Sequence, residues 1–240
     1  MPSENNRFPE AILFDLDDTI IAYGSISKPI WKEICSGYSR ILGIEETTLF
    51  NAVLKTSRFY WSDPQRHRFG RNNQMLARRK IVQDALKTCG IKSDMYVNTI
   101  ADTFLARRQK AIHLFPGSIE TLEFFRGKGV KLGLITNGEA HVQREKISRF
   151  CLEKYFDGIF IEGELGYGKP DERIYSLALG SLRTKAEECW IVGDNLEWEV
   201  QIPLKLGFYT VWNDVRGKGL PEHCDFRPHR TVCCIRELMD

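Results

Sequence analysis

The fold of this chain is decided by residues 11–19, which read AILFDLDDT. Four consecutive apolar residues at 11–14 are typical of a strand that is buried on both faces of a parallel sheet. The apolar run stops abruptly at Asp15 and Asp17, and alternate residues of an extended chain point to the same side. We therefore expect a buried strand whose carboxyl end presents two neighbouring carboxylates.

The same pattern recurs further along the chain. Apolar runs that predict strands occupy residues 130–135, 158–161, 189–192 and 209–212. Segments with helical periodicity lie between them, at residues 118–127, 139–150 and 171–179. Alternation of strand and helix predicts an α/β fold with a doubly wound, Rossmann-like parallel sheet.

The segment between the first strand and residue 112 is different. It contains helix-length periodic stretches, for example 30–42 and 74–86, and no convincing buried strand. We predict an α/β core domain formed by residues 1–24 and 112–240, with an inserted α-helical cap domain at residues 25–111. About thirty residues separate Thr136 from Lys169, which leaves no room for a second large insertion there.

Composition narrows the class of protein. The chain has 240 residues, a net charge of +2 and no low-complexity tract, which describes an ordinary globular protein and argues against nucleic acid as a partner. Neither a signal peptide nor a membrane span is apparent, so we expect a cytoplasmic protein without a membrane partner. The seven cysteines have no zinc-like spacing and are expected to be reduced.

Polar groups follow three of the predicted strands. Asp15 and Asp17 end the first, Thr136 and Asn137 end the second, and Asp194 ends another. Ligands bind at the carboxyl edge of an open parallel sheet, so we expect these groups to share one crevice. Several carboxylates in a confined space require a cation, and Mg²⁺ suits them because it binds few carboxylates, several waters and a phosphate oxygen.

Phosphate chemistry is consistent with the remaining residues. Lys169 can neutralise both a carboxylate nucleophile and a phosphate group. Thr136 and Asn137 offer a hydroxyl and an amide, and Gly138 lets the backbone approach an anion closely. Taken singly, each of these residues would more often be a strand terminus, a helix cap or a turn.

As an ordered set, the motifs FDLDDT at residues 14–19, TNG at 136–138, GKP at 168–170 and GDN at 193–195 resemble those of haloacid dehalogenase superfamily phosphatases. The resemblance covers residues 8–24 and about 112–240. It implies that Asp15 attacks phosphorus to form an aspartyl phosphate and that Asp17 serves as the acid and base. It also implies that Mg²⁺ is bound by Asp15, Asp194 and the backbone carbonyl of Asp17.

One position departs from the family pattern. Glu199 stands where a second aspartate is common, and Glu197 is a competing candidate for supporting the metal. The resemblance leaves a phosphomutase and a catalytically silent binding protein open as alternatives, whereas Asp17 argues against a dehalogenase. The expected substrate is a small phosphorylated metabolite. The sequence chooses neither the metabolite, nor the oligomeric state, nor a role for the arginines between residues 66 and 79.

Overall fold

The computed structural model of the chain describes residues 8–240 and divides them into two compact units. The first unit comprises the chain up to Ala22 together with His113–Asp240, and the second comprises Tyr23–Ile112. The role of the second unit as a cap stays a prediction.

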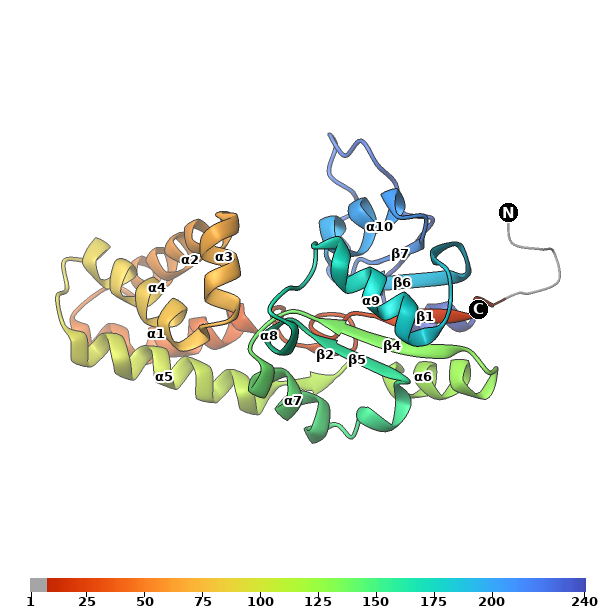
Figure 1. Ribbon diagram of the computed structural model, residues 1–240. Helices are drawn as coiled ribbons and strands as arrows, with labels where there is room; N and C mark the ends of the chain where they lie inside the picture. Colours follow the sequence, from red (N-terminus) through yellow and green to blue (C-terminus); the bar gives the residue numbers. More distant parts are fainter. Residues whose placement is uncertain (1–7) are drawn as a thin grey trace. The chain divides into compact units, whose positions relative to one another are not determined.

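A six-stranded sheet forms the centre of the first unit, in the order β5-β4-β1-β6-β7-β8 (Figure 1). Every neighbouring pair in this sheet is parallel. The chain begins at a central strand, extends the sheet to one side through β4 and β5, and then extends it to the other through β6, β7 and β8. This is the predicted doubly wound topology, and the fold class is confirmed. The strands are β1 (Ala11–Phe14), β4 (Lys131–Thr136), β5 (Gly158–Ile161), β6 (Cys189–Gly193), β7 (Tyr209–Asn213) and β8 (Arg230–Val232).

Helices cover both faces of this sheet. On one face, Leu13 and Ile191 pack in a cluster with Tyr175 of α9. On the other face, the ring of Trp190 meets that of Phe125 of α6, with centroids 6.2 Å apart. Adjacent residues of a strand thus pack against helices on opposite faces of the sheet, which explains why β1 and β6 are apolar throughout. The helices of this unit are α6 (Ser118–Gly127), α7 (Ala140–Arg149), α8 (Glu162–Leu165), α9 (Glu172–Leu182) and α10 (Ile202–Lys205).

Short elements complete the first unit. A two-stranded antiparallel ribbon pairs β2 (Ile21–Ala22) with β3 (His113–Leu114), where the chain leaves and re-enters the unit. A π-helical turn, η3 (Leu196–Gln201), follows β6, and three 3₁₀ turns lie at Glu153–Tyr155, Ala186–Glu188 and Ile235–Met239. The sequence did not lead us to expect β2, β3 or the π-helical turn, because such short elements carry no periodic signal.

The second unit is helical. It contains α1 (Ser27–Leu42), α2 (Glu46–Ser62), α3 (Pro64–Arg71), α4 (Gln74–Thr88) and α5 (Asp94–Ala111). Its core is apolar and includes a flat stack of Trp31 of α1 on Phe104 of α5, with ring centroids 4.0 Å apart and planes 10° apart. A smaller cluster joins Tyr60 of α2 to Ala77 and Ile81 of α4. Tyr60 and Trp61 therefore help to pack α2 against α4, whereas Phe59 is exposed.

Two sequence expectations concern the chain as a whole. None of the helices in the part of the chain that the structure describes is both long and apolar enough to cross a membrane. All seven cysteines are free thiols, and burial raises the pKa of Cys35 and of Cys189 to about 12, so these two are inert at neutral pH.

Candidate active site

The carboxyl ends of three adjacent strands gather the predicted polar groups. Asp15 directly follows β1, Thr136 is the last residue of β4, and Asp194 directly follows β6. Because β4, β1 and β6 are neighbours in the parallel sheet, these ends lie at one edge. The structure thus brings together groups that lie more than 170 residues apart in the sequence.

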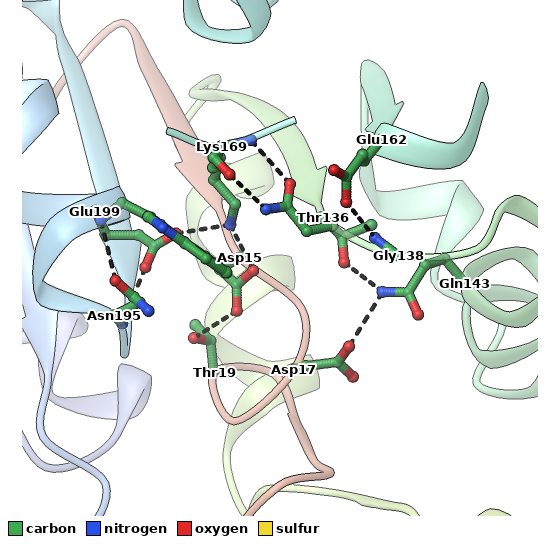
Figure 2. A network of polar contacts seen from close by, with 12 residues as sticks. Asp15, Asp17, Thr19, Thr136, Gly138, Gln143, Glu162, Lys169, Asn195 and Glu199 are labelled. Carbon is green, nitrogen blue, oxygen red and sulfur yellow. Dashed lines mark hydrogen bonds and ion pairs between the residues drawn. The ribbon is translucent and has the colours of Figure 1, made fainter. Parts of the chain in front are cut away.

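Lys169 connects two buried carboxylates. Its Nζ lies 2.6 Å from Asp15 Oδ1 and 2.6 Å from Glu199 Oε1 (Figure 2). The side chains of Lys169 and Glu199 are each only 1% exposed. The hydroxyl of Thr19 donates to Asp15 Oδ2 at 3.2 Å, so both carboxylate oxygens of Asp15 are hydrogen-bonded. One ammonium therefore compensates two acidic groups in an environment almost free of water.

The electrostatics of this cluster favour protons or a cation. Burial raises the pKa of Asp15, and the charge of Lys169 only partly opposes that effect. Burial likewise raises the pKa of Glu199 to about 7, against the opposing charge of Lys169. Burial alone would lower the pKa of Lys169, but the charges of Asp15 and Glu199 outweigh it and raise that pKa. Lys169 is therefore a permanent cation.

The Asp194 carboxylate lies among negative charges that are only weakly compensated. It makes no hydrogen bond or ion pair with any residue in the described range 8–240. Burial and the negative charges of Asp15, Glu199 and Asp18 raise its pKa to about 9, with only Arg216 acting against them. Lys169 already pairs with both Asp15 and Glu199. The crevice around Asp194 therefore has an excess of negative charge that a divalent cation would balance.

The donor set suits Mg²⁺ rather than a metal held by protein side chains alone. No group of three or more His, Cys, Asp or Glu side chains within residues 8–240 has the geometry of a metal site. Mg²⁺ is usually held by one or two carboxylates, with waters and substrate oxygens completing the octahedron. Asp15 and Asp194 offer such a pair of hard oxygen ligands, so the residues present fit this ion.

Asp17 is held by two residues of α7. Lys146 Nζ lies 2.8 Å from each carboxylate oxygen of Asp17, and Gln143 Nε2 donates to Asp17 Oδ2 at 3.1 Å. The Lys146 side chain is 1% exposed, whereas that of Asp17 is 23% exposed. Gln143 also donates to Thr136 Oγ1 (Figure 2). Asp17 is thereby oriented by α7 while it remains open to solvent.

The TNG motif is tied into the backbone around it. The Asn137 side chain donates from Nδ2 to the Lys169 carbonyl at 2.7 Å and accepts at Oδ1 from the Lys169 amide at 2.9 Å. The Gly138 amide donates to Glu162 Oε2 at 3.1 Å. Thr136 is fully buried. These contacts position Lys169, and direct phosphate binding by Thr136 and Asn137 stays a prediction.

The loop after Asp17 is held by residues at and just beyond the end of β7. Asp18 adopts a left-handed backbone conformation with φ of 62°. Its carbonyl accepts from Asn213 Nδ2 at 3.1 Å, and its carboxylate pairs with Arg216 Nη2 at 3.0 Å. Two groups at the end of β7 therefore hold the turn that carries the acidic motif.

Several residues of this site escaped the sequence analysis. Lys146 and Gln143 were missed, although their spacing places both on the face of α7 that also buries Ile147, and a lysine on an apolar face is an unusual signal. Between the two glutamates considered, the structure brings Glu199 into the crevice, where Oε2 also accepts from the Asn195 amide at 3.0 Å. Glu197 is exposed.

A family model described as haloacid dehalogenase-like hydrolase matches residues 9–202. The chain belongs to this family. The family predicted from the four motifs is thereby confirmed, as is the prediction of an enzyme of its phosphatase branch, since curated relatives over most of the chain are phosphatases. A phosphoserine phosphatase of Thermus thermophilus is 28% identical over 95% of this chain and 96% of its own length.

A second curated relative and a solved structure are also similar to this chain over nearly its whole length. A glyceraldehyde 3-phosphate phosphatase of Methanocaldococcus jannaschii is 27% identical over 96% of each chain. Among solved structures, the HAD-hydrolase YfnB from Bacillus subtilis superposes with a TM-score of 0.73 over 97% of each chain at 18% identity, which shows a shared fold. The site residues named above are proposals for this family member.

Proposed function

We propose that this haloacid dehalogenase-like phosphatase hydrolyses a small phosphate monoester with the help of Mg²⁺ and forms an aspartyl phosphate on Asp15. The observation that carries the proposal is the burial and the raised pKa of the Asp15 and Asp194 carboxylates. Two carboxylates meet at the carboxyl edge of the sheet, burial raises the pKa of both, and Asp194 has no partner within the described residues. This arrangement favours a bound cation next to a carboxylate that can act as a nucleophile.

Asp15, Asp194 and the backbone carbonyl of Asp17 would hold the ion. When bound, Mg²⁺ supplies charge neutralisation for the phosphate oxygens and thereby reduces their repulsion of the nucleophile. Lys169 contributes a second positive charge at 2.6 Å from Asp15 Oδ1. The ammonium both holds the carboxylate in place and lowers the cost of bringing an anionic phosphate to it.

Asp17 would transfer the proton. Its carboxylate is more exposed than that of Asp15, and Lys146 and Gln143 fix its direction. In the first half of the reaction Asp17 would protonate the leaving oxygen, and in the second half it would take a proton from the attacking water. A small phosphorylated metabolite is the proposed substrate, in keeping with the relatives, one named for phosphoserine and one for glyceraldehyde 3-phosphate. A cytoplasmic location stays a prediction.

The test is hydrolysis of p-nitrophenyl phosphate with and without Mg²⁺. We expect turnover that EDTA abolishes, that excess Mg²⁺ restores and that Asp15→Asn eliminates. Asp225→Asn is the matched control, because Asp225 is exposed and lies outside this crevice. A phosphorylated, hydroxylamine-sensitive intermediate should accumulate in Asp17→Asn but not in Asp15→Asn. Full activity in EDTA, or in Asp15→Asn, would overturn the proposal.

Assays with a panel of phosphate esters would identify the substrate class. Phosphate release from phosphoserine, glyceraldehyde 3-phosphate, sugar phosphates and nucleoside monophosphates should single out one class by its kcat/KM. Recovery of an isomeric sugar phosphate in place of inorganic phosphate would identify a phosphomutase instead. No turnover of any ester by a folded, Mg²⁺-supplied chain would identify a silent binding protein.

A further inference from the structure

Two arginines in the second unit are buried without an acidic partner. Arg78 of α4 is 8% exposed and Arg108 of α5 is 4% exposed. Arg78 makes no hydrogen bond or ion pair with any residue in the range 8–240, and its Nε is buried and unsatisfied. Among the described residues, the Arg108 side chain donates a single hydrogen bond, from Nη2 to the neutral Oε1 of Gln74 at 2.6 Å. Buried guanidinium groups are normally paired with carboxylates, so this pair is unusual.

The two guanidinium groups share one aromatic ring. Their central carbons lie 4.7 Å (Arg78) and 5.2 Å (Arg108) from the centroid of Phe104. Trp31 stacks flat on Phe104 at 4.0 Å and occupies one face, which leaves the other face and the edge of that ring to the two cations. Aromatic faces stabilise a cation through the quadrupole of the ring but accept none of its N–H bonds. The hydrogen-bonding edges of both groups are therefore largely unused.

The guanidinium groups of Arg78 and Arg108 repel each other. Burial and the charge of Arg108 lower the pKa of Arg78 to about 9. Two desolvated positive charges close together destabilise the unit that contains them, and apolar side chains of similar volume would pack there at less cost. Packing alone thus gives no reason for two arginines at this place, whereas an anion would satisfy both charges and their donors together.

We propose that Arg78 and Arg108 form an anion-binding site within the second unit, for a small oxyanion that carries two negative charges. A phosphate dianion or a dicarboxylate has the charge and the planar pairs of oxygen atoms that two guanidinium groups recognise. The hydroxyl of Tyr23 donates to Gln74 Oε1 at 2.6 Å, and its ring lies 4.2 Å from the Arg108 guanidinium, so Arg108 is held in place before any ligand arrives. The site does not depend on the phosphatase reaction.

The test is calorimetric titration of the full chain in EDTA with malonate and, separately, with inorganic phosphate, at ionic strength matched by sodium chloride. We expect saturable binding that is weakened at least about tenfold in Arg78→Met and in Arg108→Gln, because each removes a charge-assisted hydrogen-bond donor. Arg107→Gln is the matched control, since Arg107 is the neighbour of Arg108 on α5 but is exposed and paired with Glu33. It should bind as the unsubstituted chain does.

The two titrations distinguish the ligand. Malonate binding that is lost in Arg78→Met indicates a carboxylate ligand. Binding of phosphate alone, if it is likewise lost in Arg78→Met, indicates a phosphate group. Phosphate binding that survives Arg78→Met belongs elsewhere in the chain and overturns the proposal, as does the absence of saturable binding by either anion.

Thermal unfolding separates binding from packing. Malonate or phosphate should raise the melting temperature of the unsubstituted chain and not that of Arg78→Met, and ligand-free Arg78→Met should melt no lower than the unsubstituted chain. A lower melting temperature in Arg78→Met and Arg108→Gln, with an unchanged response to both anions, would show that these arginines serve packing alone.

Discussion

Replacing Lys169 by methionine tests how far this lysine compensates the buried carboxylates of the first unit. The side chain is of similar length, so the change removes a charge with little loss of volume. At 2.6 Å, each of its two ion pairs has a Coulomb attraction of about 6 kcal/mol for an effective dielectric constant near 20. Most of this attraction offsets the desolvation of three buried charges, so the net effect is smaller.

Loss of Lys169 leaves Asp15 and Glu199 buried and uncompensated. Breaking a buried ion pair on one side typically costs about 3–5 kcal/mol of unfolding free energy. For a chain of this size, each kcal/mol lowers the melting temperature by about 2–4 °C, so we expect a fall of about 10 °C. Activity should be lost as well, because the cation beside the nucleophile is gone.

The unfolding free energy that Lys169→Met loses relative to the unsubstituted chain should depend on pH. Without Lys169 the folded-state pKa values of Asp15 and Glu199 lie further above their unfolded values, so the native state binds more protons than the unfolded state. Stability of Lys169→Met should therefore fall as pH rises from about 4 towards 8, and the deficit should be small near pH 4. Thermal unfolding followed by circular dichroism at several pH values measures this.

A double-mutant cycle with Glu199→Gln sharpens the test. Glu199→Gln removes one of the carboxylates that Lys169 compensates, so the double variant should be more stable than the sum of the single effects predicts. Lys185→Met, at an exposed position, controls for the substitution itself. Additive effects, or a deficit that does not change with pH, would refute the account of Lys169 as a shared, buried counter-charge.

Three further predictions follow from the same crevice. Lys146→Met should lower kcat about tenfold, because Asp17 loses the ammonium that orients both of its oxygens. Mg²⁺ should raise the melting temperature more at pH 9 than at pH 6, because the pKa of Asp194 is raised to about 9 and the ion must displace its proton at lower pH. Gly193→Ala should cost about 1–3 kcal/mol of stability, since a Cβ there would overlap the buried side chain of Glu199.

Each of these has its own control. Lys185→Met again serves for the Lys146 variant, and unchanged steady-state kinetics in Lys146→Met would contradict a positioning role. Asp194→Asn should abolish the pH-dependent response to Mg²⁺, and an equal response at both pH values in the unsubstituted chain would contradict the assignment. Gly180→Ala, on an exposed face of α9 with open space around it, is the control for Gly193→Ala and should unfold at the same temperature as the unsubstituted chain or slightly higher, because alanine favours a helix over glycine.

The sequence by itself determined the α/β class and the position of the strand ends. Apolar runs such as residues 11–14 and 189–192 are local signals, because a strand buried on both faces must be apolar throughout. The polar residue that ends each run then marks the carboxyl edge, and so Asp15, Thr136 and Asp194 could be grouped before any coordinates.

Only the tertiary structure decided how the charges are paired. Lys146 meets Asp17 across 129 positions in the sequence, and Lys169 meets Asp15 across 154. Such pairs depend on the packing of α7 and of the loop before α9 against the sheet, which no local periodicity encodes. The same holds for Arg78, to which the sequence assigned no role, and for Arg108: both are buried against one aromatic ring. Burial sets the energy of a charge, and burial is a property of the folded chain.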